Sequence, residues 1–133
     1  MATYNVDITS KAVRTFGDSL EKRLIQSHRS FDNTASLFTI KVIMHHCQSS
    51  HGYWLRVGGY HGDQINYRFI RVIIDIAAGE RSYNEKQELL QKTMECCMDY
   101  QGKHAPECEI EVRINEVEEG DVMVVRPFNG QLA

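Results

Sequence analysis

One short segment, MHHCQSSH at residues 44–51, groups four side chains that can bind a metal ion or act as nucleophiles: His45, His46, Cys47 and His51. Imidazole nitrogen and thiolate sulfur are ligands of zinc, and a closed zinc site needs four ligands in tetrahedral geometry. In a strand, successive side chains point to opposite faces, so His46 would point away from His45 and Cys47. No second pair of ligands follows at a metal-binding spacing, and we therefore expect no metal site and no cofactor.

The α-amine at the start of the chain is a second reactive group. In MATYNVDIT, apolar Tyr4, Val6 and Ile8 alternate with polar residues, which is the period-two pattern of a half-buried strand. Chain ends usually fray, because few contacts hold them. A strand that begins next to residue 1 would instead hold the terminal amine at a fixed position.

The composition is that of an ordinary globular chain. With 133 residues, 42% hydrophobic and 25% charged, it is expected to form a single domain, residues 1–133, with a real core. The net charge of −3 argues against binding to nucleic acids or anionic membranes, which require a basic surface. The sequence has no apolar run of membrane-spanning length and no leader segment, so a cytoplasmic location is expected. The adjacent Cys96 and Cys97 argue against a disulfide framework.

The first half of the chain shows the pattern of a strand, a helix and a second strand. Thr9 and Ser10 are expected to cap a helix, whose apolar positions recur at helical spacing: Val13, Phe16, Leu20 and Leu24. This pattern fades at residues 28–33, and LFTIKVIM, residues 37–44, then alternates as a strand. Residues 46–64 contain several glycines and are expected to form an excursion or a small hairpin.

The second half repeats this order. In INYRFIRVIIDIAAG, residues 65–79, one face is apolar and the other is partly apolar, which is typical of a central strand. Ser82 and Glu85 stand three residues apart, as in a capping box at a helix start. The helix is expected to bury an apolar stripe of Leu90, Met94, Cys97 and Met98. CEIEVRINEV, residues 108–117, alternates as a strand with one polar face, and residues 121–133 are expected to form a C-terminal tail.

Two successive β-α-β units predict the architecture. Each crossover helix is long enough to connect parallel strands, so the chain should form an α+β fold with a four-stranded mixed sheet and both helices on one face. The central strand is apolar on both faces, so the face without helices needs a cover. We expect partner subunits to provide it.

With these elements in order, the chain resembles the tautomerase superfamily, and in particular its 5-carboxymethyl-2-hydroxymuconate isomerase branch. The most specific likeness lies in YRFIRVIIDIAAGERSYNEKQELLQK, residues 67–92, while MATYNVDIT and FTIKVIM are similar to the first two strands of that branch. The resemblance implies a βαβ-βαβ protomer that assembles as a homotrimer. It also implies an isomerase that moves a proton in a small enol or unsaturated carboxylic acid.

The resemblance further implies the roles of three residues. In the family, removal of the initiator methionine exposes an N-terminal proline whose amine is the catalytic base. This sequence has alanine at that position, so the candidate base is the α-amine of Ala2 after removal of Met1. Arg81, in the turn after the central strand, matches a family arginine that binds the substrate carboxylate, with Glu80 inserted before it. Lys41 stands where the family carries basic residues on the second strand.

Three hypotheses follow for the function. The first is a weak or altered isomerase that uses the Ala2 amine, with Arg81 and Lys41 as ligands of a small carboxylate. The second is a non-catalytic trimer of the same fold that binds small acids or has a structural role. The third is a metal-binding module built on residues 45–51.

Overall fold

Two β-α-β units make up most of the computed structural model, which describes residues 2–14, 19–47, 56–57, 60–61, 67–121 and 123. The first unit comprises β1 (Ala2–Thr9), α1 (Leu20–Phe31) and β2 (Ile40–Cys47). The second unit comprises β5 (Arg68–Ala77), α2 (Tyr83–Gln101) and β6 (Cys108–Val117). Short 3-10 turns lie at Ser10–Ala12, Leu37–Thr39, Gly102–Glu107 and Glu119–Asp121.

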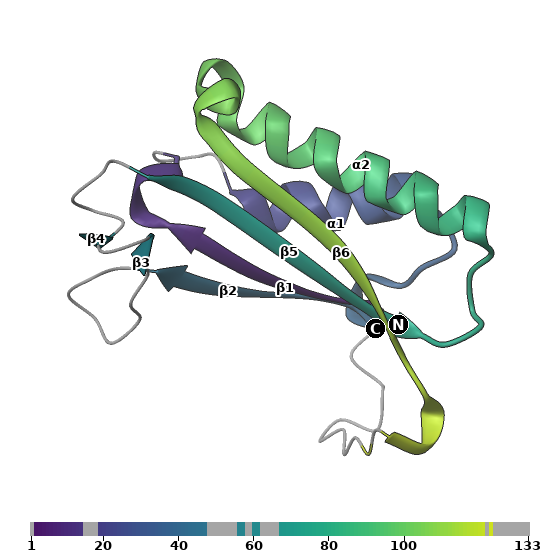
Figure 1. The fold of residues 1–133 in the computed structure, drawn as a ribbon. Helices are drawn as coiled ribbons and strands as arrows, with labels where there is room; N and C mark the ends of the chain where they lie inside the picture. Colours follow the sequence, from purple (N-terminus) through teal and green to yellow (C-terminus); the bar gives the residue numbers. More distant parts are fainter. Residues whose placement is uncertain are drawn as a thin grey trace.

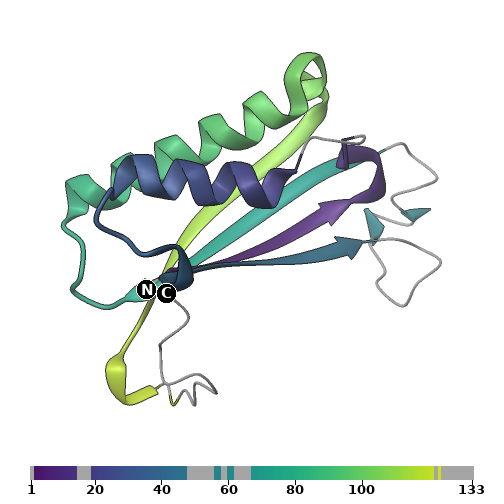
Figure 2. The same ribbon diagram turned by 180° about the vertical axis from the view of Figure 1, so that it is seen from behind.

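The four long strands form one mixed sheet in the order β2-β1-β5-β6. β1 and β2 are parallel, as are β5 and β6, and the two units meet where β1 and β5 pair in antiparallel orientation. Both helices cover the same face of the sheet (Figure 1), and Figure 2 shows the same layering from behind. This arrangement confirms the predicted α+β fold with a four-stranded mixed sheet and two helices on one face.

The core lies between the sheet and the two helices, and the central strands β1 and β5 supply most of it. The pairing register places Tyr4 opposite Ile74 and Val6 opposite Val72, and all four side chains are buried. From the helices, the buried apolar side chains include Leu20, Leu24 and Leu89. Since full burial of such a side chain contributes about 1.5–3 kcal/mol, this core fixes the strands of both units against each other.

The start of the first helix differs from the prediction. Ser10 begins a 3-10 turn, and the hydroxyl of Thr9 accepts a hydrogen bond from the amide of Phe69 (3.0 Å), so Thr9 caps no helix. The helix α1 begins at Leu20, after Ser19, whose side chain accepts from the amide of Lys22. The predicted N-cap was wrong because the Thr9 side chain at the end of β1 accepts a hydrogen bond from the neighbouring strand β5 and not from a helix.

The second helix begins as predicted. The side chain of Ser82 accepts from the amide of Glu85, and the Glu85 carboxylate accepts from the amide of Ser82. This reciprocal pair confirms the capping box and fixes the point at which the chain leaves the turn after β5.

The buried face of α2 differs from the predicted stripe. It consists of Leu89, Thr93, Cys97, Tyr100 and Gln101. Of the predicted stripe, Cys97 is buried as expected, whereas Met98 is 47% exposed. Two of the polar side chains on this face hold the segment after β1. The Gln101 side chain donates to the carbonyl of Ala12 (2.6 Å), and the Tyr100 hydroxyl accepts from the amide of Arg14 (2.7 Å). Apolar spacing alone misplaces the stripe, because Tyr100 and Gln101 are polar side chains whose burial is compensated by hydrogen bonds to the segment after β1.

The sheet face without helices was expected to be apolar along the central strand, but Arg71 and Asp75 of β5 place a polar network on it. Arg71 donates to the Asp7 carboxylate (2.9 and 2.5 Å), and the His45 ring lies 3.3 Å from the same carboxylate. The Asp75 carboxylate accepts from the side-chain amides of Asn5 and Asn115 (3.0 Å each). That partner subunits cover this face remains a prediction.

The predicted excursion and tail fall largely outside the described residues. Within residues 46–64, β3 (Arg56–Val57) pairs with β4 (Tyr60–His61) in antiparallel orientation. Of residues 121–133, the structure describes Asp121 and Met123. Among the described residues, no helix is long and apolar enough to cross a membrane.

Candidate active site

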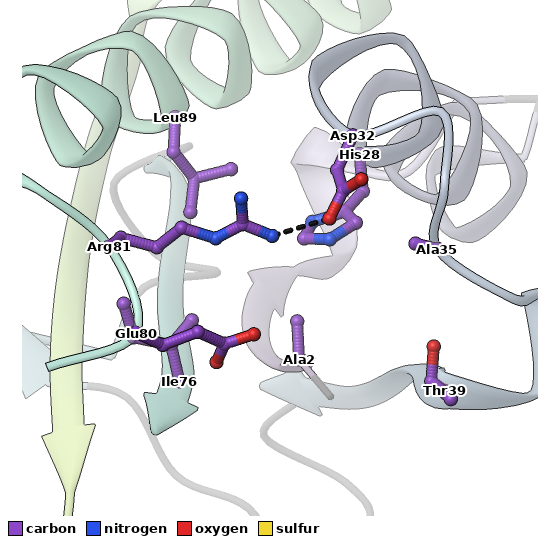
Figure 3. Close-up of a pocket in the computed structure, with 9 residues that line it drawn as sticks. All are labelled: Ala2, His28, Asp32, Ala35, Thr39, Ile76, Glu80, Arg81 and Leu89. Carbon is purple, nitrogen blue, oxygen red and sulfur yellow. Dashed lines mark hydrogen bonds and ion pairs between the residues drawn. The ribbon is translucent and has the colours of Figure 1, made fainter. Parts of the chain in front are cut away.

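A pocket lies at the end of the sheet where β1 begins and β5 ends, beneath the last turn of α1 and the first turns of α2 (Figure 3). Its volume is about 80 Å³. Because one water needs roughly 10–15 Å³ by this kind of measure, the space suits a molecule of only a few heavy atoms. The described residues that line it are Ala2, His28, Asp32, Ala35, Thr39, Ile76, Glu80, Arg81 and Leu89.

Ala2 forms the inner wall of the pocket. It is 3% exposed and pairs with Ile40 of β2 on one side and Ile76 of β5 on the other. The start of the chain is therefore built into the middle of the sheet. Removal of Met1 would leave the α-amine of Ala2 at the edge of this pocket, beside its strand neighbour Ile76 and in a lining that also includes the apolar Leu89.

Arg81 reaches the pocket from the turn between β5 and α2. This turn includes Gly79 at φ +76°, a backbone conformation that favours glycine. The Arg81 side chain is 18% exposed and donates to Asp32 (2.5 Å) and to Glu85 (3.2 Å). Its guanidinium lies over the ring of Phe31, 5.0 Å from the ring centre. The arginine is thus held by charge on two sides and by an aromatic ring on a third.

Asp32 is fixed from both directions. The amide and hydroxyl of Thr34 donate to one carboxylate oxygen (3.1 and 2.6 Å), and Arg81 donates to the other. The Thr34 hydroxyl and then the Arg81 guanidinium hold the pKa of this carboxyl well below its usual range. Asp32 is therefore ionised at neutral pH.

His28 forms the upper wall, with 5% of its surface exposed. The Tyr4 hydroxyl lies 2.7 Å from its Nδ1 atom, and the two rings meet edge to face. Burial lowers the pKa of His28, and the nearby positive charge of Arg81 lowers it further. Burial also raises the pKa of Tyr4, so the phenol keeps its proton. When Tyr4 donates to Nδ1, the neutral imidazole carries its proton on Nε2.

Glu80 adds a second carboxylate to the lining. Its side chain extends toward Ala2 in Figure 3, on the side of the pocket away from Asp32. Among the described lining residues, two carry carboxyl groups, Asp32 and Glu80, and one carries a guanidinium, Arg81.

Of the three predicted site residues, the structure brings two together. Ala2 and Arg81 line the same pocket, although Ala2 begins β1 and Arg81 lies far along the chain, in the turn before α2. Lys41 is exposed, directly follows the buried Ile40 in β2, and is not among the described lining residues. Within one chain it lies on the sheet face opposite to the pocket.

Sequence reasoning missed His28 and Asp32. The only available signal was spacing, because Leu20, Leu24 and His28 recur every four residues along one side of α1, and Asp32 follows His28 at the same spacing as the C-cap. A histidine that continues a buried row predicts a partner inside the protein. It does not by itself indicate Tyr4 or a pocket.

The histidine and cysteine segment is only partly described. His45 pairs with Asp7, His46 is exposed, and Cys47 lies at the end of β2. His51 lies outside the described residues. Among the residues that the structure describes, no group of three or more His, Cys, Asp or Glu side chains could hold a metal ion.

No protein-family model and no curated protein sequence matches the chain, but solved structures do. It is similar to Pt0534 inactivated by 2-oxo-3-pentynoate, at 14% identity over 92% of this chain and 91% of that chain, with a TM-score of 0.70. A wild-type fused 4-OT symmetric trimer matches at 18% identity over 93% and 92%, with a TM-score of 0.68. FG41 malonate semialdehyde decarboxylase inhibited by 3-bromopropiolate matches at 14% identity over 94% and 90%, with a TM-score of 0.62.

These structural neighbours are members of the tautomerase superfamily, and the chain has their β-α-β fold. At such identities the likeness defines the fold and leaves the chemistry to the residues of the pocket.

Proposed function

We propose that this protein is an isomerase of the tautomerase type, which moves a proton between carbon and oxygen of a small carbonyl compound. One observation carries the proposal: Ala2 and Arg81 line one small pocket at the start of the chain. Around an N-terminal amine in such a place, the apolar lining and the Arg81 cation favour the neutral form, whereas the Glu80 carboxylate opposes it. Arg81 can also stabilise negative charge on a substrate.

In the proposed reaction, the neutral amine of Ala2 takes a proton from the carbon next to a carbonyl group. The electrons of the broken C–H bond move onto the carbonyl oxygen, which becomes an enolate. Arg81 and the Nε2–H group of His28 donate hydrogen bonds to that oxygen. The ammonium group then returns a proton to carbon or oxygen, so the ketone and the enol interconvert.

The resemblance to the 5-carboxymethyl-2-hydroxymuconate isomerase branch supports a small enol or unsaturated acid as substrate. Two structural neighbours were captured with small carboxylates, 2-oxo-3-pentynoate and 3-bromopropiolate. The catalytic strength proposed here is low, because the primary amine of Ala2 lacks the rigid ring of a proline, and a mobile base loses part of the advantage of positioning.

We also propose that the protein works as a homotrimer. A fused 4-OT neighbour is a symmetric trimer, and the polar sheet face without helices offers a surface for partner subunits. In that assembly, Lys41 can contribute to a site only where this face of one copy meets the pocket of another. Its role as a ligand of a substrate carboxylate therefore depends on the trimer.

A non-catalytic binding protein is the second candidate. It is favoured by the contacts of Arg81, whose charge is already matched by Asp32 and Glu85. A guanidinium that is already paired with two carboxylates stabilises the negative charge of an enolate less than an unpaired guanidinium does.

Exchange of carbon-bound protons tests the enzyme hypothesis. Protein shown by intact mass to lack Met1 would be incubated in D₂O with pyruvate or pyruvamide, and loss of the methyl signal followed by proton NMR. We expect exchange above the buffer rate, a rise of about tenfold in Ala2→Pro and a fall of about tenfold or more in Arg81→Ala.

Lys86→Ala serves as the matched control, since Lys86 is a cation of α2 that pairs with Glu116 and is not a lining residue. It should leave the exchange rate unchanged. Two results would favour the non-catalytic protein: no exchange with either compound, or an exchange rate that is unchanged in both Ala2→Pro and Arg81→Ala.

A further inference from the structure

The charges of the pocket bear on which ligand it accepts. An arginine that recognises a carboxylate usually does so with two parallel N–H groups on one edge of the guanidinium. In this protein, an internal carboxylate already holds one of those groups: Asp32 lies 2.5 Å from Arg81, and both side chains are only 18% exposed. Asp32 itself lines the pocket, so it stands where the carboxylate of a ligand would compete.

Displacing Asp32 would be unfavourable for three reasons. Thr34 holds its second oxygen with two hydrogen bonds, so the carboxylate cannot swing away without breaking them. A carboxylate moved off Arg81 would remain partly buried without its counter-charge, which is strongly disfavoured. Glu85 also stays on the other side of the guanidinium at 3.2 Å, so an incoming anion would be a third negative charge around one cation.

An uncharged ligand meets none of these obstacles. A guanidinium has five N–H donors, and the hydrogen bonds within the described residues use two of them for Asp32 and Glu85. The remaining donors can still bind a neutral carbonyl oxygen, as can the Nε2–H group of His28. Among the described lining residues, the two acidic side chains Asp32 and Glu80 outnumber the one guanidinium, which further disfavours an anion.

We propose that Asp32 determines the ligand class of this pocket: by occupying Arg81 it excludes carboxylates and leaves the site to small uncharged carbonyl compounds. This inference rests on the proposed function, because it takes the pocket beside Ala2 as the ligand site. It keeps the proposed proton transfer but replaces the acids that the resemblance implies with uncharged carbonyl compounds, such as amides, esters, ketones or aldehydes.

Pyruvate and pyruvamide form a suitable pair of probes, because they differ in charge and hardly in size. Binding to Met1-free protein would be measured by ¹H–¹⁵N NMR titration, following the backbone amides of the lining residues Ala35 and Thr39. We expect pyruvamide to bind at least about fivefold more tightly than pyruvate. The inference would be overturned by the wild-type protein alone if pyruvate bound as tightly as pyruvamide. It would also be overturned if neither probe shifted the signals of the pocket amides.

Asp32→Asn tests the residue itself. Asparagine keeps the shape of the side chain and an oxygen that can accept from Thr34, but it removes the charge. Pyruvate should bind about tenfold more tightly to this variant, since Arg81 is then open to a charge-assisted pair, while the affinity for pyruvamide should change less than about twofold.

Glu85→Gln is the matched control. It removes a carboxylate that also contacts Arg81, keeps the capping box, in which glutamine is accepted, and alters no lining residue. Pyruvate affinity should rise less than about threefold in this variant, because only long-range charge is lost. Equal gains in Asp32→Asn and Glu85→Gln would overturn a specific role of Asp32. Should Asp32→Asn fail to fold, Thr34→Ala, which loosens Asp32, is expected to raise pyruvate affinity in the same direction.

The binding readout separates this inference from the proposed function. A preference for pyruvamide without any proton exchange would support the ligand class and contradict the isomerase. Proton exchange that is as fast with pyruvate as with pyruvamide would support the isomerase and contradict the ligand class.

Discussion

Arg81 is the residue on which several parts of the pocket depend. It contacts Asp32 at the end of α1, Glu85 in the first turn of α2 and the ring of Phe31. One side chain thus ties the two helices together directly above Ala2. The same contacts that position this cation also reduce its net charge, and that combination distinguishes the pocket from one built to hold anions.

The Arg81–Asp32 pair predicts a pH dependence of stability. The pKa of Asp32 is lowered in the folded protein, so its contribution is complete above the ordinary carboxyl pKa of about 4 and is lost as the pH falls toward the lowered value. The free energy of unfolding in urea should therefore exceed that of Asp32→Asn at pH 7, and the difference should shrink below about pH 4. A difference that stays constant across this range would contradict the assignment.

The Tyr4–His28 contact predicts the state of the imidazole. Burial and the charge of Arg81 lower the pKa of His28, so the ring should titrate below about 6.5 and carry its proton on Nε2. Long-range ¹H–¹⁵N NMR of the histidine rings measures both properties. In Tyr4→Phe, loss of the donor should populate the other tautomer and lower the unfolding free energy by about 1–3 kcal/mol. A pKa at or above the ordinary histidine value would contradict this view of the site.

At the scale of elements, the buried face of α2 is the clearest test of packing. Leu89 is buried and lines the pocket, whereas Met98 is 47% exposed. Leu89→Ala should cost about 2–5 kcal/mol of unfolding free energy, because it leaves a cavity in the core. Met98→Ala should cost less than about 0.5 kcal/mol, as for an exposed position. A larger loss in Met98→Ala would instead favour the stripe of Leu90, Met94, Cys97 and Met98.

Patterns along the chain were sufficient for the elements whose signal is periodic or local. The alternation in β1 and β5 and the capping box of α2 depend on neighbouring residues, and each was correctly predicted. The start of α1 was not, because Thr9 bonds to Phe69, a residue distant in sequence. The buried face of α2 was misplaced for a similar reason, since Gln101 is satisfied by the carbonyl of Ala12.

The candidate site shows the same division. Ala2 and Arg81 were found through a likeness in short motifs, whereas His28 and Asp32 acquire their meaning only from contacts. In the sequence, Asp32 is an ordinary polar residue at the end of a helix. Only the contact with Arg81 of the second β-α-β unit shows that it belongs to the pocket. Lys41 was chosen by its position on the second strand, and strand alternation places it on the face away from the pocket.

At the scale of the molecule, the sheet face without helices is expected to form the trimer interface. Ile43 lies on this face in β2 and is 42% exposed. Light scattering should give a mass three times that of the 133-residue chain, and Ile43→Asp should reduce it to that of a monomer, because it introduces a charge into the interface. Met98→Asp, a change of similar exposure on the helical layer, should leave the trimer intact. A monomeric wild-type protein would contradict the assembly.

If the α-amine of Ala2 acts as the base, proton exchange must depend on the protonation state of that amine, so the pH dependence of exchange is the decisive measurement. For protein lacking Met1, the exchange rate of pyruvamide should rise with pH along a single titration curve, since only the neutral amine accepts a proton. The same chain with Met1 retained should show no exchange above buffer. Equal rates in the two forms, or a rate that does not respond to pH between about 5 and 9, would contradict the claim.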